Sequence, residues 1–237
     1  MAHKYNESSL KELTDLNHIV HRPSAYIPDT DYLGRQTIAR EIIDNASDEM
    51  ELLGSGIMDV FLFLNRRKKD YQVVVRDTGR SIPVGKLIDV FSKTKISGKF
   101  DQDSYQFSAG SLGYGSSVTL ALSKWFRAIA LNQDVIGDVT LHRDKIPTSI
   151  DTISNQLGHT GTIVMFSPDD DILTGNEEYI NNLGNLEQFL SHLSLFSKFR
   201  TRLIVVEQPI PESIRQASSL QVIELSLIHI SEPTRPY

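Results

Sequence analysis

The fold of this chain is decided by ten residues that put an acidic face on an apolar helix, Arg40-Glu41-Ile42-Ile43-Asp44-Asn45-Ala46-Ser47-Asp48-Glu49. At about 100° per residue, Glu41, Asn45 and Asp48 fall on one side of such a helix. The other side carries an apolar stripe at helical spacing, made of Ile38, Ile42, Ala46, Met50 and Leu53. We therefore expect a helix over 33–53 that ends before Gly54.

A carboxylate one turn away from a carboxamide can do two jobs in catalysis. Glu41 can orient and deprotonate a water molecule, and the side-chain oxygen of Asn45 can bind a hard cation such as Mg²⁺. The same residues also fit an ordinary solvated helix face, and this stretch taken alone favours that simpler interpretation.

Further helices and strands surround this helix. A hairpin is expected from strands 58–64 and 71–76, and its basic turn, Arg66-Arg67-Lys68-Lys69, is interpreted as a solvated tip. Other helices are predicted at 8–22, 86–91, 116–123 and 177–197, and other strands at 125–131, 138–143, 161–167 and 202–207. This mixture predicts an α+β fold, a two-layer α/β sandwich with a mixed, mostly antiparallel sheet.

A second motif directly follows the hairpin's second strand, Arg76-Asp77-Thr78-Gly79-Arg80-Ser81-Ile82-Pro83. An aspartate at the end of a strand can accept a hydrogen bond from an exocyclic amine in a pocket, and Gly79 lets a flat ring approach the backbone. A plain Asp-Thr-Gly turn is the simpler alternative, and such turns are common.

A third motif is the glycine-dotted loop before helix 116–123, Ser108-Ala109-Gly110-Ser111-Leu112-Gly113-Tyr114-Gly115-Ser116-Ser117. Successive backbone N–H groups next to a helix N-terminus can hold phosphates. The spacing differs from the Rossmann order, and Gly98-Lys99 is no P-loop because Lys93 and Phe100 occupy the positions of the first glycine and the Ser/Thr. A fourth motif, Gly158-His159-Thr160-Gly161-Thr162, is by itself only a turn.

In this order along the chain, the four motifs resemble the GHKL ATPase superfamily of gyrase, Hsp90-type chaperones, histidine kinases and MutL. The likeness is greatest to gyrase B subunits and related type II topoisomerases. It covers roughly residues 5–207 and is carried by Arg22-Pro23-Ser24-Ala25-Tyr26-Ile27-Pro28-Asp29-Thr30 and by the stretches 41–49, 98–105 and 108–123. The resemblance implies the GHKL (Bergerat) form of the sandwich.

The resemblance also implies a site for ATP and Mg²⁺. In it Glu41 is the general base that polarises the attacking water, and Asn45 is the Mg²⁺ ligand. Asp77 accepts the adenine amine, with Gly79 beneath the ring and Thr162 supporting the aspartate.

Other residues join this site by the same resemblance. Arg80 pairs with Glu49 at the pocket mouth, and Tyr5 reaches the nucleotide of a partner subunit from an N-terminal arm. The remaining implied nucleotide contacts are Asp48, Ile82, Lys99, Tyr105, Gly110, Leu112, Gly113, Tyr114, Gly115 and Ser116.

Several positions depart from the family's pattern. Ser81 replaces the second glycine of Asp-x-Gly-x-Gly, Ala109 the first glycine of the phosphate loop, and Leu112 a histidine common in bacterial gyrases. The segment 83–99 is also shorter. These departures suggest a divergent relative, such as a viral one.

Composition excludes several classes of function. The 237 residues contain no cysteine, so disulfides, thiolate nucleophiles and cysteine-ligated zinc are ruled out. A net charge of −6 argues against a DNA-binding surface across the whole domain. No apolar run approaches the roughly 20 residues of a membrane span, and the first residues lack the order of a signal peptide, so we expect a cytoplasmic protein without membrane contact.

Two clusters resemble metal sites only superficially. His18 and His21 share a helix face, but no carboxylate completes a site, so solvated or core histidines are favoured. Three adjacent carboxylates, Asp169-Asp170-Asp171, are most simply an exposed loop.

Three segments are expected along the chain: an arm and the start of the first helix (1–17), the ATP-binding domain (18–207), and the start of a linker or transducer with a non-native tail (208–237). Residues 225–237 resemble translated sequencing-adapter read-through. The implied partners are a second copy joined through the arm when ATP binds, a topoisomerase cleavage subunit, and DNA held by domains outside this chain. The chain alone is expected to turn over ATP weakly.

Alternative functions remain open on the sequence. Another GHKL clamp, such as a MutL-like ATPase, is the alternative among enzymes, although the Tyr26-Ile27 segment and the 98–101 lid favour a topoisomerase. A nucleotide-gated module without catalysis, or a decoy that binds a topoisomerase subunit, is the alternative outside enzymes.

Overall fold

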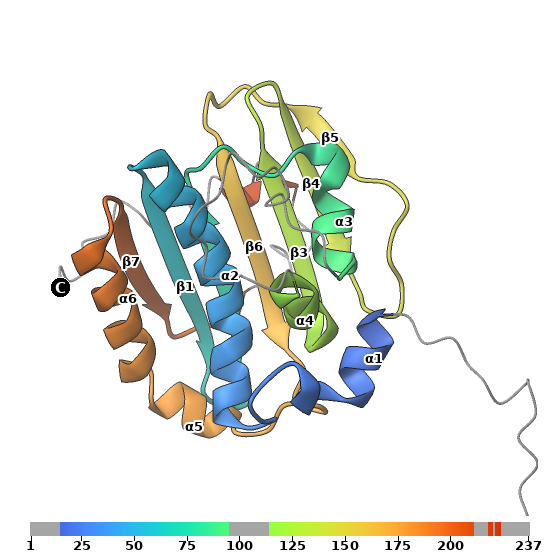
Figure 1. Ribbon diagram of the computed structural model, residues 1–237, viewed down its shortest axis with the longest axis vertical. Coiled ribbons are helices and arrows are strands. Elements are labelled where there is room, and N and C mark those ends of the chain that lie inside the picture. The colour runs from blue at the N-terminus through green and yellow to red at the C-terminus, as the bar shows by residue number, and fades with distance from the viewer. Residues whose placement is uncertain (1–14, 95–113, 211–217, 220, 224–237) are drawn as a thin grey trace, which may run out of the picture.

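The computed structural model describes residues 15–94, 114–210, 218–219 and 221–223, arranged around one seven-stranded sheet (Figure 1). The sheet order is β5-β4-β3-β6-β2-β1-β7, and neighbours pair antiparallel except β1 and β7, which are parallel. The strands are β1 (Ile57–Asn65), β2 (Asp70–Asp77), β3 (Ser123–Leu131), β4 (Val135–Leu141), β5 (Asp151–Ser154), β6 (Gly161–Pro168) and β7 (Arg200–Val206). The predicted α+β class with a mixed, mostly antiparallel sheet is therefore confirmed.

Helices cover one face of this sheet (Figure 1). They are α1 (Asp15–His21), α2 (Tyr32–Leu53), α3 (Leu87–Ser92), α4 (Gly115–Ala121), α5 (Asn176–Asn181) and α6 (Gly184–Phe196), with the 3₁₀ helices η2 (Pro23–Ala25) and η3 (Val84–Lys86). None of the helices within the described ranges has the length and apolar character needed to cross a membrane.

Side-chain alternation along β2 separates two apolar clusters. Val73 and Val75 face the helices and pack in one cluster with Ile42 of α2. Val74 points to the opposite face and packs in a second cluster, which includes Val222 from the C-terminal part of the chain. Both faces of the central strands are thus buried, which fixes their register.

The long helix α2 has clear signals at both ends. The side chain of Asp31 accepts a hydrogen bond from the Leu33 N–H at 3.1 Å, and Gly54 ends the helix in the left-handed conformation (φ 67°). The predicted apolar stripe is buried up to Met50, but Leu53 is 42% exposed. The helix nevertheless ends at Leu53, before Gly54, as the sequence predicted.

Two other predictions of secondary structure need correction. The single helix predicted over 177–197 is two helices, α5 and α6, which separate before Gly184, a residue type that disfavours helix interiors. Strand β5 has no predicted counterpart, because all four of its residues are exposed and it carries no buried alternation.

The acidic run Asp169-Asp170-Asp171 is not simply an exposed loop. Asp169 is 2% exposed and pairs with Arg143 at 2.6 Å, while Asp170 pairs with Arg35 at 2.6 Å and with Lys124. The prediction failed because Arg35 is buried, and a buried guanidinium needs an anionic partner. Among the described residues, no group of three or more His, Cys, Asp or Glu is placed to hold a metal ion.

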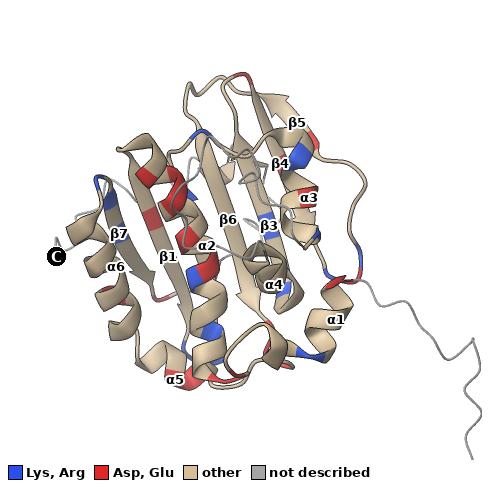
Figure 2. Cartoon of the chain, viewed as in Figure 1, with Lys and Arg blue, Asp and Glu red and all other residues tan. Residues whose placement is uncertain are grey.

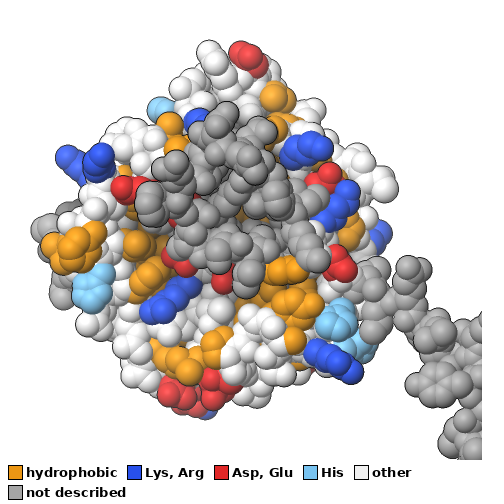
Figure 3. Space-filling model, viewed as in Figure 1, with side chains coloured by type: hydrophobic (Ala, Val, Ile, Leu, Met, Phe, Trp, Pro, Cys, Tyr) orange, Lys and Arg blue, Asp and Glu red, His pale blue; other side chains and the backbone are white. Residues whose placement is uncertain are grey.

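The basic turn between β1 and β2 is a solvated tip, as predicted. Arg66 and Lys69 have side chains 53% and 58% exposed, and they form surface ion pairs with Glu207 and Glu177. On the helix face, the described acidic and basic side chains are interspersed and form no broad basic surface (Figure 3).

Candidate functional site

The site is built along α2, whose ribbon carries several acidic residues (Figure 2). Glu41 and Glu49 lie on this helix eight residues apart, which corresponds to about 12 Å along the axis at 1.5 Å per residue. Helix α4 lies against the Glu41 part of this helix, and the end of β2 lies against the Glu49 part. One rigid helix therefore sets the spacing of the two halves of the site.

The first half joins α2 to the beginning of α4. A Cβ atom built on Gly115 would lie 1.7 Å from Oε2 of Glu41, so a larger residue here would displace the Glu41 carboxylate. The side-chain amide of Asn45 donates to Oγ of Ser116 at 3.0 Å. The hydroxyl of Thr119 donates to the Ile38 carbonyl at 3.0 Å and ties the two helices together below these residues.

Tyr114, at the start of α4, extends this half toward the N-terminal part of the chain. Its ring packs edge-on against Tyr26, with ring centroids 6.2 Å apart, and Tyr26 in turn shares a 2.9 Å hydrogen bond with His18. His18 is thus part of the packing, as expected for a structural histidine.

The second half is centred on Asp77, which ends β2 and is 7% exposed. Its Oδ1 accepts hydrogen bonds from the backbone N–H groups of Gly79 (2.8 Å) and Thr162 (3.2 Å). Burial raises the pKa of Asp77 to about 7, although these two hydrogen bonds lower it. A buried carboxyl with this pKa can hold or release a proton near neutrality, and it can accept a hydrogen bond from a ligand.

Two glycines let the backbone close around Asp77. A Cβ atom on Gly161 would lie 2.1 Å from the Asp77 carbonyl oxygen, and Gly161 has a φ of +143°. A Cβ atom on Gly79 would lie 2.9 Å from Oδ1 of Asp77 and 2.5 Å from Cγ of Glu49. Thr162 therefore contacts the aspartate through its backbone N–H, because Gly161 brings β6 this close.

Arg80 and Glu49 form the predicted pair at the edge of the site. Nε and one terminal nitrogen of Arg80 donate to the two carboxylate oxygens of Glu49 at 2.7 and 2.9 Å, and the Arg80 backbone N–H donates at 3.0 Å. Burial raises the pKa of Glu49, but the hydrogen bonds and the charge of Arg80 outweigh it and hold that pKa below its usual value. Glu49 is thus an anion that anchors the turn after β2.

Ser81 occupies a conformation that favours glycine. Its φ is +74°, and the next carbonyl, that of Ile82, accepts a 3.0 Å hydrogen bond from the side-chain amide of Asn132. The second glycine of Asp-x-Gly-x-Gly, which Ser81 replaces, is the sequence feature that indicates this positive φ. Asn132 itself was missed, since a lone asparagine after a strand carries no motif.

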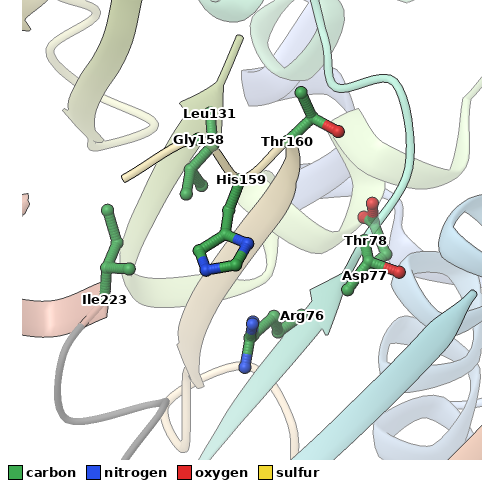
Figure 4. A pocket seen from close by; sticks show the side chains of 8 residues that line it. All are labelled: Arg76, Asp77, Thr78, Leu131, Gly158, His159, Thr160 and Ile223. Carbon is green, nitrogen blue, oxygen red and sulfur yellow. The ribbon is translucent and has the colours of Figure 1, made fainter. Parts of the chain in front are cut away.

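A cavity of about 230 Å³ lies beside the same strand end (Figure 4). Arg76, His159 and Ile223 line it, on the side of the sheet that faces away from α2. Asp77 contributes to its rim, but its neighbour Arg76 leaves the strand on the opposite side (Figure 4). The cavity therefore meets the site at Asp77, while Leu131 and Ile223 place its apolar part on the sheet face opposite Glu41, Asn45 and Glu49.

The structure brings together most of the described residues that the sequence singled out. Asp48 lies on the same helix as Glu41 and Asn45, and Ile82 packs against the helix-side core. The other predicted site residues lie outside the described residues: Tyr5, Lys99, Tyr105, Gly110, Leu112 and Gly113.

Comparisons with known proteins agree with this arrangement. Residues 30–171, more than half of the chain, match the family described as histidine kinase-, DNA gyrase B-, and HSP90-like ATPase. The chain is 36% identical to the B subunit of DNA topoisomerase 4 from Mycoplasma capricolum over 178 residues, 72% of this chain and 27% of that protein. It is 30% identical to the DNA gyrase B subunit of Thermus thermophilus over 177 residues (71% and 27%) and 31% identical to that of Spiroplasma citri over 211 residues (84% and 31%).

These matches span only 27 to 31% of the length of the three relatives, and they fall on the part that contains the two halves of the site. The motifs of α2 and of the end of β2 both lie within the matched 30–171 region. The chain therefore belongs to the family of histidine kinase-, DNA gyrase B- and HSP90-like ATPases.

Proposed function

We propose that this chain is the ATP-binding and ATP-hydrolysing domain of a type II DNA topoisomerase, within residues 18–207. The observation that carries the proposal is the buried Asp77, whose Oδ1 is held by two backbone N–H groups while α2 faces it with Glu49. The likeness to the B subunits of gyrase and topoisomerase 4 over the same region supports a topoisomerase rather than another clamp ATPase.

Asp77 recognises the adenine. Oδ1 is occupied by the amides of Gly79 and Thr162, so Oδ2 is the oxygen that accepts the exocyclic amine. Gly79 leaves room for the flat ring, since a side chain there would strike Glu49. Guanine presents an acceptor at the same position, and two acceptors without a shared proton repel one another.

The phosphates lie toward Glu41, the other half of the site. Glu41 accepts a proton from the water that attacks the γ-phosphorus, and the bond to the ADP oxygen breaks, releasing ADP and phosphate. Gly110, Gly113 and Gly115 wrap the phosphates through their backbone amides, and Lys99 and Tyr105 approach the nucleotide from the lid. The further nucleotide contacts in this proposal are Asp48, Leu112, Tyr114 and Ser116.

Asn45 fits the part of a Mg²⁺ ligand. Its amide nitrogen donates to Ser116, which turns the carbonyl oxygen Oδ1 away from that contact, and carbonyl oxygens are hard ligands of the kind that Mg²⁺ takes. The cation supplies charge neutralisation for the transferred phosphoryl group.

The partners follow from the same proposal. ATP joins two copies of the chain through the N-terminal arm, Tyr5 contacts the partner's nucleotide, and a cleavage subunit and DNA-holding domains outside this chain complete the enzyme.

Substitution of Glu41 separates hydrolysis from binding. Glu41→Gln is expected to keep ATP affinity within about two-fold and to lose at least 100-fold in hydrolysis, in line with the size of general-base effects.

The matched control is Glu51→Gln, an exposed carboxylate near the end of the same helix. It is expected to leave both ATP affinity and hydrolysis unchanged. Hydrolysis in Glu41→Gln at the parent rate would show that another group activates the water, and the assignment of Glu41 would be wrong.

A further inference from the structure

The cavity beside the end of β2 has a charged wall and an apolar wall (Figure 4). Arg76, His159 and Thr160 supply the polar part, and Leu131 and Ile223 the apolar part. Asp77 and Thr78, at the end of β2, also line the cavity. Leu131 and Ile223 belong to the cluster on the sheet face opposite α2. Asp77 lines this cavity and is also part of the proposed nucleotide site, whose other half lies on α2 across the sheet.

Arg76 shares its nearest carboxylate, that of Asp59, with a second arginine. Asp59 is 1% exposed, and both of its carboxylate oxygens accept hydrogen bonds from Arg202, at 2.5 and 2.8 Å. The nearest terminal nitrogen of Arg76 lies 3.7 Å from Oδ2 of Asp59, which is too long for a hydrogen bond. Two guanidinium groups therefore share the carboxylate of Asp59, and the other carboxyl that acts on Arg76 is Asp77, whose pKa burial raises to about 7.

The guanidinium of Arg76 is also short of hydrogen-bond partners. Its side chain is 12% exposed, and within the described part of the chain its buried terminal nitrogen has no hydrogen-bond acceptor. Burial holds the pKa of Arg76 below its usual value, even though Asp59 raises it. Buried charged donors are normally satisfied, so this donor, beside a cavity, is suited to bind an anionic group.

We propose that this cavity binds a small organic anion. Its carboxylate or phosphate group pairs with Arg76 and accepts a hydrogen bond from His159, and its apolar body lies against Leu131 and Ile223. The volume of about 230 Å³ is below the ~300–1,000 Å³ of sites for drug-sized ligands, so the ligand is small. The cavity adjoins the proposed nucleotide site at Asp77, but the inference does not rest on that function.

The test uses benzoate and inorganic phosphate as probes and follows the imidazole resonances of His159 by NMR. The protein is kept saturated with a non-hydrolysable ATP analogue and Mg²⁺, so that a probe cannot enter the nucleotide site. Benzoate is expected to shift these resonances saturably, and to bind at least ten-fold more weakly to Arg76→Gln. The matched control is Arg66→Gln at the solvated hairpin tip, which is expected to bind benzoate like the parent.

A second variant, His159→Gln, tests the same proposal if Arg76→Gln does not fold. His159 lies in an exposed connection, and His159→Gln is expected to weaken benzoate binding several-fold by calorimetry while the urea midpoint stays unchanged. Equal benzoate affinity in the parent and in Arg76→Gln, or no saturable shift with either probe, would overturn the proposal. Phosphate binding as tight as benzoate binding would overturn the apolar part of the ligand. Failure to bind the ATP analogue would instead count against the nucleotide site alone.

Discussion

Asp77→Asn is the substitution that tests the nucleotide site most directly. Asparagine keeps an oxygen where Gly79 and Thr162 donate, so the two backbone hydrogen bonds survive. The other position becomes an NH₂ group, which meets the adenine amine donor to donor. Loss of one buried hydrogen bond costs ~1–3 kcal/mol, so ATP affinity should fall about 5- to 150-fold.

The same substitution is expected to stabilise the folded chain relative to the parent as the pH rises toward 8. Burial raises the pKa of Asp77 from its ordinary 3.8 to about 7, so the folded chain binds this proton more tightly than the unfolded chain. Protonation of Asp77 therefore contributes fully to the free energy of unfolding of the parent below pH 4, and this contribution is lost as the pH rises through about 7. At about 1.36 kcal/mol per pKa unit, the difference between 3.8 and about 7 corresponds to about 4 kcal/mol.

Two measurements check this reasoning. Calorimetry gives the ATP affinity of the parent, of Asp77→Asn and of the control Asp134→Asn, an exposed residue of the β3–β4 turn that should leave binding unchanged. Urea unfolding from pH 4 to pH 8 should show the parent losing stability relative to Asp77→Asn. Unchanged ATP affinity in a folded Asp77→Asn would refute the adenine assignment, and parallel pH profiles would refute the role of burial.

Further expectations concern the turn after β2 and the assembly. Ser81→Gly should raise the free energy of unfolding by about 0.5–1 kcal/mol, because serine at φ +74° is strained, whereas Ser81→Val should lower it; equal urea midpoints for all three proteins would contradict this. A non-hydrolysable ATP analogue with Mg²⁺ should shift the chain from monomer toward dimer in light scattering, and removal of residues 1–7 should abolish the shift. Equal dimerisation without the arm would exclude it as the clasp.

The sequence predicted those parts of the fold that follow from local periodicity and end signals. Helix α2, the β1–β2 hairpin and the Glu49–Arg80 pair are confirmed, because each depends on spacing within one element or on a motif with a known order. The class of the fold followed from the mixture of these elements.

Features that depend on tertiary partners were out of reach. The burial of Asp169 is set by Arg143, and that of Arg35 by the acidic run more than 130 residues away, so no local pattern encodes either. Asn132 follows β3, and it reaches the site through a hydrogen bond to the carbonyl of Ile82, which follows β2. The sharing of Asp59 by Arg76 and Arg202 likewise arises only when β1, β2 and β7 lie side by side.

The unbroken helix α2 fixes the distance that a ligand must span to contact both halves of the site. About 12 Å separates its Glu41 and Glu49 levels, and a 22-residue hydrogen-bonded helix cannot shorten that interval without breaking its own ladder. A compound that fills only the Asp77 end, such as adenosine, would gain base recognition yet touch nothing at α4. The length of the ligand's phosphate chain is therefore a second criterion, besides the identity of the base, by which this site would select nucleotides.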